Sequence, residues 1–194
     1  MQQPTLDTAR LVLRPFTLAD APTVQRLAGA DEVADTTLNI PHPYPDGAAE
    51  QWIATHAENF KAGDSATFAI VLRATAELCG AIGLDISRRH RRAELAYWIG
   101  VPYWNQGHAT EAATALLTYG FTALQLNRIH ARHVTRNPAS GRVMQKIGMT
   151  FEGIQREHFR KDDRFEDVAN YGILRHEWES RSSLISPTFV EEKP

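Results

Sequence analysis

The sequence predicts an α+β fold, with a mixed, mainly antiparallel sheet of seven strands flanked by about four helices. Three observations lead to this prediction. Short segments with alternating or β-branched residues recur along the whole chain. Between them lie longer segments whose apolar residues repeat at helical spacing. Three of the strand segments follow one another without a helix, as the strands of an antiparallel meander do.

The first third of the chain predicts a strand and two helices. Residues 9–16 alternate, so that Leu11 and Leu13 are expected on the core face. A helix is expected at 21–28, with a proline in its first turn, and the proline-rich segment 36–47 is expected to be a loop. The other helices are expected at 48–61, 107–124 and 139–147, and the other strands at 67–73, 78–86, 93–101, 128–135, 151–159 and 165–174.

The composition excludes several classes of protein. The formal net charge is −2, so the chain as a whole has no electrostatic attraction to nucleic acid or to an anionic membrane. Cys79 is the only cysteine, and an internal disulfide is therefore impossible. No apolar run approaches the ~20 residues of a membrane helix, and the start lacks the features of a signal peptide. We expect a cytoplasmic protein without membrane contact, with a single domain at 1–179 and a flexible tail at 180–194.

The stretch 102–112 reads PYWNQGHATEA and marks the passage from a strand to a helix. The first N–H groups of a helix have no partner inside it and lie at the positive end of the helix dipole. They can bind a phosphate without any lysine, and small residues such as Gly107 and Ala109 let the backbone approach a ligand closely. A single glycine is also ordinary in a turn, and the spacings of the nucleotide-binding glycine motifs are missing here.

This turn resembles the coenzyme A pyrophosphate loop of the GNAT acetyltransferases, whose pattern is Q/R-x-x-G-x-G/A. Gly107 and Ala109 fill the last two fixed positions, whereas Trp104 replaces the first. A tryptophan followed by A-T-E-A is similar to the branch of ribosomal-protein N-terminal acetyltransferases, the RimJ/RimL-like branch. Other stretches resemble the same branch in chain order, at 9–16, 93–104, 137–149 and 167–178.

The resemblance implies the GNAT fold and a reaction in which a primary amine directly attacks acetyl-CoA, the co-substrate, and takes its acetyl group. It implies no metal and no covalent enzyme intermediate, and the acceptor is a protein N-terminus or a small molecule. The residues that the resemblance places at coenzyme A are Ile99, Val101, Trp104, Asn105, Gln106, Gly107, His108, Ala109, Thr110, Asn137 and Ser140.

The resemblance also puts Glu94 beside the reactive end of the co-substrate, where a carboxylate can take the proton of the acceptor ammonium. An equally weighted alternative is a surface glutamate that pairs with Arg91 or Arg92. The N–H groups from Ile99 to Val101 are candidates for polarising the thioester oxygen. Members of the family splay this strand away from the next one, which would leave its N–H and C=O groups free; an ordinary paired strand is the alternative.

Ser140 is the candidate that gives a proton to the departing thiolate, with Asn137 beside the arm of the co-substrate, as the resemblance implies. The segment N-P-A-S is also what a helix start looks like on any fold. Tyr97 and Tyr171 are alternative proton donors, although aromatic residues on strands more often belong to the core.

Other readings of the sequence concern metals and partners. His130 and His133 are three apart on an expected strand and so point to opposite faces, which argues against a metal site. A non-catalytic GNAT-like module that binds coenzyme A or a protein is the alternative function. The basic runs 88–92 and 156–164 could contact RNA or the ribosome, although such runs are more often solvated turns. The partners to consider are the amine acceptor, a second copy in a homodimer, and the ribosome or RNA.

Overall fold

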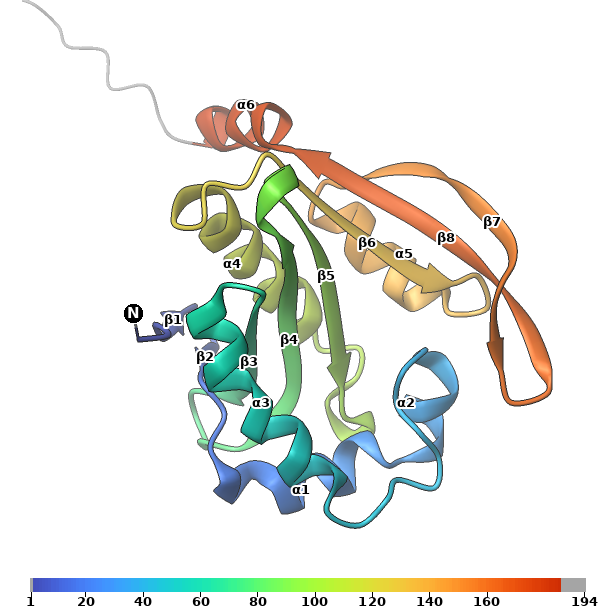
Figure 1. The fold of residues 1–194 in the computed structure, drawn as a ribbon. Helices are drawn as coiled ribbons and strands as arrows, with labels where there is room; N and C mark the ends of the chain where they lie inside the picture. Colours follow the sequence, from blue (N-terminus) through green and yellow to red (C-terminus); the bar gives the residue numbers. More distant parts are fainter. Residues whose placement is uncertain (1, 186–194) are drawn as a thin grey trace, which may run out of the picture.

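The computed structural model of the chain describes residues 2–185, and its ribbon is drawn in Figure 1. A single eight-stranded sheet runs through the molecule in the order β1-β2-β3-β4-β5-β6-β8-β7. The strands are β1 (Leu6–Asp7), β2 (Leu11–Arg14), β3 (Ser65–Leu72), β4 (Leu78–Ser87), β5 (Arg92–Ile99), β6 (Arg128–Val134), β7 (Thr150–Lys161) and β8 (Arg164–Leu174).

The pairing of β5 with β6 differs from the rest of the sheet. Within the described residues, these two strands are parallel and all other neighbouring strands are antiparallel. They pair only from Arg92, opposite Arg128, to Glu94, opposite His130. Beyond Glu94, β5 continues beside β4 alone, and the two strands diverge in Figure 1. The sheet is therefore open along one edge of β5.

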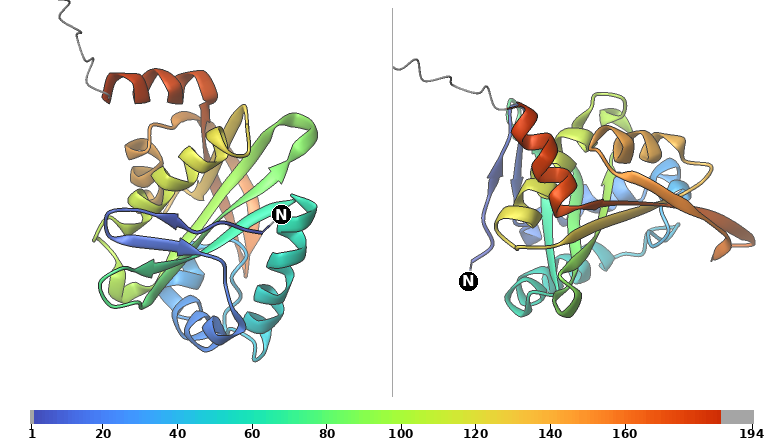
Figure 2. Two further views of the ribbon diagram at one scale, coloured as in Figure 1. Left: turned by 90° about the vertical axis from the view of Figure 1, so that its left-hand side faces the viewer. Right: turned by 90° about the horizontal axis from the view of Figure 1, so that it is seen from above.

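Helices cover both faces of the sheet, as Figures 1 and 2 show. α4 and α5 bury residues such as Leu116 and Met144 in the larger core, on what we call the α4 face. α1 and α3 bury Val24, Leu27 and Ile53 in a smaller core on the opposite side, the α3 face. The helices are α1 (Ala21–Ala28), α2 (Asp31–Thr36), α3 (Ala48–Ala62), α4 (His108–Thr122), α5 (Pro138–Lys146) and α6 (Arg175–Ile185).

The predicted α+β fold with a mixed, mainly antiparallel sheet is confirmed, and local patterns located most elements. Leu11 and Leu13 are fully buried, because a strand with one face on the core places alternate residues inside. The helix at 48–62 ends at Gly63, whose φ of 71° is left-handed, a conformation that glycine adopts without a steric penalty.

The numbers of elements were predicted less well. The sheet has eight strands instead of seven because the short β1 joins its edge. The described residues contain six α-helices instead of about four. One of the two additional helices is α2, which has only six residues and therefore little internal stability. The side chain of Lys161 donates to the Ala34 carbonyl in α2 and to the Thr37 carbonyl just after it.

The other additional helix, α6, continues the chain beyond β8. It runs to Ile185, so the domain boundary expected at 179 falls inside a helix. The Arg175 side chain donates to the Leu126 carbonyl at 2.9 Å, and the ring of Trp178 packs against Phe121 with centroids 5.4 Å apart. Residues 186–194 of the expected tail lie outside the described residues.

Candidate active site

The divergence of β5 and β6 opens a cleft of about 950 Å³. On the α3 face its walls come from α3 and the segment 36–41, and on the α4 face they come from the start of α4 and from α5. The cleft brings together every residue that the sequence placed in the site except Val101 and Gln106. Residues that are far apart in the sequence therefore share one cavity.

The backbone of β5 presents alternate residues to this cleft. The Gly100 N–H donates to the carbonyl of Cys79 in β4 at 2.9 Å. In an antiparallel pair, the backbone groups of successive residues alternate between the two edges of a strand. Those of Tyr97 and Ile99 therefore face away from β4, toward the gap beside β6. An extended ligand can pair with such an edge as an added strand would.

The carbonyl groups expected to be free at Ile99 and Val101 already accept hydrogen bonds, which corrects that expectation. The Ile99 carbonyl accepts the indole N–H of Trp104 at 2.6 Å. Val101 begins a 3₁₀ turn instead of ending the strand, because Pro102 cannot continue a ladder. Its carbonyl accepts the Trp104 backbone N–H at 3.2 Å. The N–H groups of Ile99 and Val101 remain candidates for contact with a thioester oxygen, whereas that of Gly100 is used in the sheet.

The start of α4 has the geometry of an anion site. Gly107 precedes the helix with a φ of 81°, and Asn105 has a φ of 60°, left-handed values that glycine and asparagine tolerate. Among the residues that the structure describes, no side chain caps this helix start. The N–H groups of His108, Ala109 and Thr110 are therefore available at the positive end of the helix. A phosphate group fits this arrangement.

Residues of the turn between β1 and β2 hold the start of α4 in place. Glu111 accepts hydrogen bonds from the Arg10 backbone N–H, the Arg10 Nε–H and the Thr8 hydroxyl, each at 2.7 Å. Arg10 also donates to the Gln106 carbonyl at 2.9 Å, and the Gln106 side chain donates to the Pro102 carbonyl at 3.1 Å. Gln106 thus stabilises the turn before α4 and does not line the cleft. Sequence reasoning missed Arg10 and Glu111, because their contact joins segments 101 residues apart.

The hydroxyl groups of Tyr97 and Ser140, the two predicted donors to the leaving thiolate, are hydrogen-bonded to each other. Tyr97 Oη lies 2.7 Å from Ser140 Oγ and 3.1 Å from the Ser140 carbonyl. Burial raises the pKa of Tyr97 to about 12, although the bond to Ser140 opposes the rise. The phenol therefore keeps its proton near neutral pH and can act as a donor.

Asn137 caps α5 and also lines the cleft. Its Oδ1 accepts the Ser140 N–H at 3.2 Å, so the reading as a helix cap is correct and is compatible with a place in the site. Tyr171, the other donor considered, is buried against His133 and Phe151. It is not among the residues that line the cleft, and it belongs to the core.

Glu94 lines the cleft at the point where β5 and β6 separate. Its Oε1 accepts the Nε–H of Arg132 at 2.7 Å. The alternative of a pair with Arg91 or Arg92 is wrong, and Arg91 donates to the Gln125 carbonyl. The Glu94 carboxylate therefore lies at the cleft with one of its oxygens already bound to Arg132.

α3 supplies the opposite wall of this half of the cleft. Trp52, His56 and Asn59 lie at helical spacing and line the cavity. The side chain of His56 is 7% exposed, and its ring packs edge-on against Trp52 with centroids 4.4 Å apart. Burial lowers the pKa of His56 to about 4, so the ring is neutral. Sequence reasoning treated α3 as structural and missed this wall, although the spacing of these residues indicated one face.

Clusters of metal-ligating side chains and membrane-spanning helices are both absent from residues 2–185. Among residues 2–185, no group of three or more histidine, cysteine, aspartate or glutamate side chains could hold a metal ion. His130 lies opposite Glu94, whereas His133 is beneath Gly141 of α5, so the two face opposite sides of β6. No helix in the same range is long and apolar enough to cross a membrane.

The cleft defines a class of protein. The uncapped start of α4, the free edge of β5 and the hydroxyl pair of Tyr97 and Ser140 all line it. These features suit a long ligand with an anionic end, an amide-containing arm and a thioester at its tip. The fold and cleft are those of an acyltransferase that takes its acyl group from coenzyme A.

Comparisons with known proteins identify the family. Residues 10–150 match the model of the acetyltransferase (GNAT) domain. The chain is 34% identical over 173 residues to the uncharacterized N-acetyltransferase YoaA of Bacillus subtilis, an alignment that covers 89% of this chain and 97% of YoaA. YdaF of the same species, provisionally assigned as a ribosomal N-acetyltransferase, is 35% identical over 103 residues, 53% of this chain and 56% of YdaF. The crystal structure of a GNAT-family acetyltransferase from Bacillus anthracis superposes with a TM-score of 0.79 at 25% identity, over 89% of this chain and 99% of that one.

The chain belongs to the GNAT acetyltransferases. The similarity to YdaF supports the RimJ/RimL-like branch that the turn at 104–112 indicated. The protein is an N-acetyltransferase that uses acetyl-CoA as its acetyl donor. The predicted family, enzyme class and co-substrate are therefore confirmed, and a non-catalytic module is not favoured.

Proposed function

We propose that acetyl-CoA lies along the cleft, with its pyrophosphate at the start of α4 and its pantetheine arm along the free edge of β5. The observation that carries this proposal is that three binding elements line one cavity: the N–H groups of 108–110, the edge at Ile99 and the hydroxyl pair of Tyr97 and Ser140. Each suits a different part of the same molecule. The thioester then lies beside Tyr97 and Ser140.

The acceptor amine enters from the α3 face and loses a proton before it attacks. A carboxylate on this face takes the proton, and Glu94 is the residue that the sequence suggested. The bond from nitrogen to the acetyl carbon forms as the bond from that carbon to sulfur breaks. The pair of Tyr97 and Ser140 donates a proton to the departing sulfur.

The acceptor is a primary amine of a protein N-terminus or of a small molecule, and the provisional assignment of YdaF as a ribosomal N-acetyltransferase supports a ribosomal acceptor. A homodimer, contact with the ribosome or RNA, and cytoplasmic residence stay predictions. The basic run 156–164 is partly used inside the molecule, where Lys161 donates to the Ala34 carbonyl and Arg164 pairs with Asp35. This use favours a structural role for that run.

The experiment uses the full chain with acetyl-CoA and a panel of primary amines, which includes short peptides with free N-termini and simple alkylamines. Free thiol and the mass of the acetylated amine are measured together. We expect thiol release that depends on the amine and an acetylated product for at least one member. Tight binding of coenzyme A without acetylation of any member would contradict the proposed function.

A further inference from the structure

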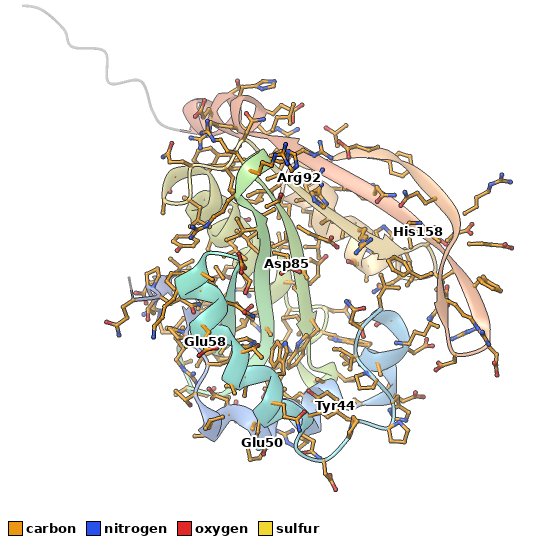
Figure 3. All side chains as sticks on the ribbon, in the orientation of Figure 1. Tyr44, Glu50, Glu58, Asp85, Arg92 and His158 are labelled. Atoms are coloured by element: carbon orange, nitrogen blue, oxygen red, sulfur yellow. The ribbon has the colours of Figure 1, made fainter. Side chains whose placement is uncertain are left out.

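A second carboxylate faces the cleft beside Glu94. Asp85 on β4 lies directly opposite Glu94 on β5, and both line the cavity. Side chains that are directly opposite in an antiparallel pair share one face, with Cβ atoms about 4.5–5.5 Å apart. Figure 3 labels Asp85 over the middle of the sheet, to one side of α3. The two carboxylates therefore form a pair on the α3 face.

The two members of this pair have different partners. Arg132 binds Glu94 at 2.7 Å, whereas Asp85 has no hydrogen bond or ion pair in the part of the chain that the structure describes. Burial and the charge of Glu94 raise the pKa of Asp85. Asp85 is thus a carboxylate whose affinity for a proton is raised and which has no counter-charge among the described residues.

The charges around this pair restrict the acceptor. Asp85 and Glu94 are the carboxylates that line the cleft, and Arg132, the cation near them, is already engaged. The other two cations of the lining, Arg142 and Lys146, come from α5 on the α4 face. An acceptor with a carboxylate next to its amine would meet like charges and no free cation, which costs binding free energy.

A buried polar group in the same cleft also lacks a partner. His56 is 7% exposed, and neither of its ring nitrogens has a hydrogen-bond partner in the described residues. Buried polar groups are normally paired, so an unpaired imidazole that lines a cavity is suited to a ligand. Because its ring is neutral, it matches an uncharged polar group, such as an amide, and does not attract a carboxylate as a cation would.

We propose that Asp85 binds the ammonium group of the acceptor and removes its proton, and that the acceptor is a primary amine whose neighbouring group is uncharged. This inference rests on the proposed function. One proton passes from the ammonium to the Asp85 carboxylate and later leaves to solvent. The neutral amine forms its bond to the acetyl carbon as the carbon–sulfur bond breaks. The nitrogen then loses a second proton to water, and the sulfur receives one from the pair of Tyr97 and Ser140, which takes up a proton from water in its place. The charge of Glu94, which pairs with Arg132, increases the proton affinity of Asp85.

The test compares the wild type with Asp85→Asn on matched acceptors: alanine and alaninamide, phenylalanine and phenylalaninamide. We expect the wild type to prefer each amide over the free acid. Asp85→Asn should lower kcat/KM for the amides by ~10²–10⁴-fold near neutral pH, as loss of a general base does, and it should reduce the preference for the amide. The affinity for coenzyme A should not change.

The loss in Asp85→Asn should become smaller at high pH, where the acceptor is already neutral. The groups that face Asp85 are Glu94 on β5 and Ser65 on β3, with His130 and Arg132 of β6 and His56 of α3 farther out.

Glu94→Gln is measured in parallel because Glu94 is the titratable group opposite Asp85. Glu58→Gln is the matched control, since Glu58 is exposed on α3 outside the cleft and is labelled in Figure 3. Its kinetics should equal those of the wild type.

Three outcomes would overturn the inference. Asp85→Asn with wild-type kcat/KM beside an impaired Glu94→Gln would make Glu94 the base. Equal use of free acids and amides by the wild type would remove the restriction on the acceptor. A wild type that binds coenzyme A but acetylates no amine would contradict the proposed function itself. A melting curve of Asp85→Asn shows whether the variant is folded. If it is not, the wild type is treated with carbodiimide in the presence of butyltrimethylammonium, an ammonium ion that cannot be coupled to the activated carboxylate. We expect this ion to protect Asp85 from modification, and unprotected modification would overturn the inference.

Discussion

The hydrogen bond of 2.7 Å between Tyr97 and Ser140 joins two hydroxyl groups into one proton relay. We expect Tyr97→Phe and Ser140→Ala each to lower turnover by about 10²-fold, at the lower end of general-acid effects. The double variant should lose little more, because residues that act as a unit are not additive. The defect should persist at high pH, since a neutral amine does not replace a donor to sulfur. Initial rates of acetyl transfer from acetyl-CoA, measured for each variant across this pH range, give the turnover.

The relay can be separated from effects on folding. Ser140→Ala keeps the cap of α5, because the capping bond uses the Ser140 N–H and Asn137 Oδ1. Tyr119→Phe is the control, since Tyr119 packs edge-on against Phe68 with ring centroids 5.9 Å apart and does not line the cleft. Its turnover should stay at the wild-type value. Losses that multiply in the double variant would show two independent groups instead of a relay.

At the scale of elements, the starts of α4 and α3 provide a matched comparison. Each helix follows a left-handed glycine, Gly107 with a φ of 81° and Gly47 with a φ of 76°. Aspartate at either position meets similar backbone strain, but only Gly107→Asp puts a negative charge where we place the pyrophosphate. We expect Gly107→Asp to bind coenzyme A at least about tenfold more weakly than the wild type does. This corresponds to a loss of about 1.4 kcal/mol or more in binding free energy. Titration calorimetry measures it.

Gly47→Asp should bind coenzyme A like the wild type. At Gly47 an added Cβ would meet no atom of the described residues within 4 Å. At Gly107 it would meet Arg10 Nη2 at 3.3 Å, the end of a flexible side chain that has to move only slightly. Both variants should therefore lose a similar free energy of unfolding, about 1–2 kcal/mol for a left-handed residue with a side chain. Wild-type affinity in Gly107→Asp would mean that the pyrophosphate binds elsewhere.

At the scale of the whole molecule, the sequence predicted local features and missed long-range ones. Periodicity located the strands and helices because it depends on neighbouring residues. The partner of Glu94 could not be predicted, because Arg132 lies on another strand 38 residues away. The position of Asp85 beside Glu94 depends on the register of β4 and β5, and α2 depends on a contact with Lys161. The splay of β5 was expected only through the family resemblance.

The buried His56 makes the stability of the whole molecule sensitive to acid. The unfolded chain binds a proton at this residue below a pH of about 6.5, whereas the folded protein does so only below about 4. Between these values the unfolded state holds more protons, so the free energy of unfolding falls as the pH falls, by up to about 1.4 kcal/mol per pH unit. His108 and His130, whose pKa values burial also lowers, add to the same slope.

His56→Phe should remove the contribution of His56 and flatten this pH dependence, as urea unfolding between about pH 7 and pH 5 would show. This range lies above the pH at which carboxylates take up most of their protons, so the difference belongs to a histidine. Near neutral pH the variant should be at least as stable as the wild type, because it removes two buried nitrogens without partners. His90→Phe, the same change at an exposed position, should keep the wild-type slope. If the free energy of unfolding of His56→Phe depends on pH as steeply as that of the wild type, the imidazole of His56 is not held neutral in solution. A steeper pH dependence in His90→Phe would mean that the method responds to surface changes.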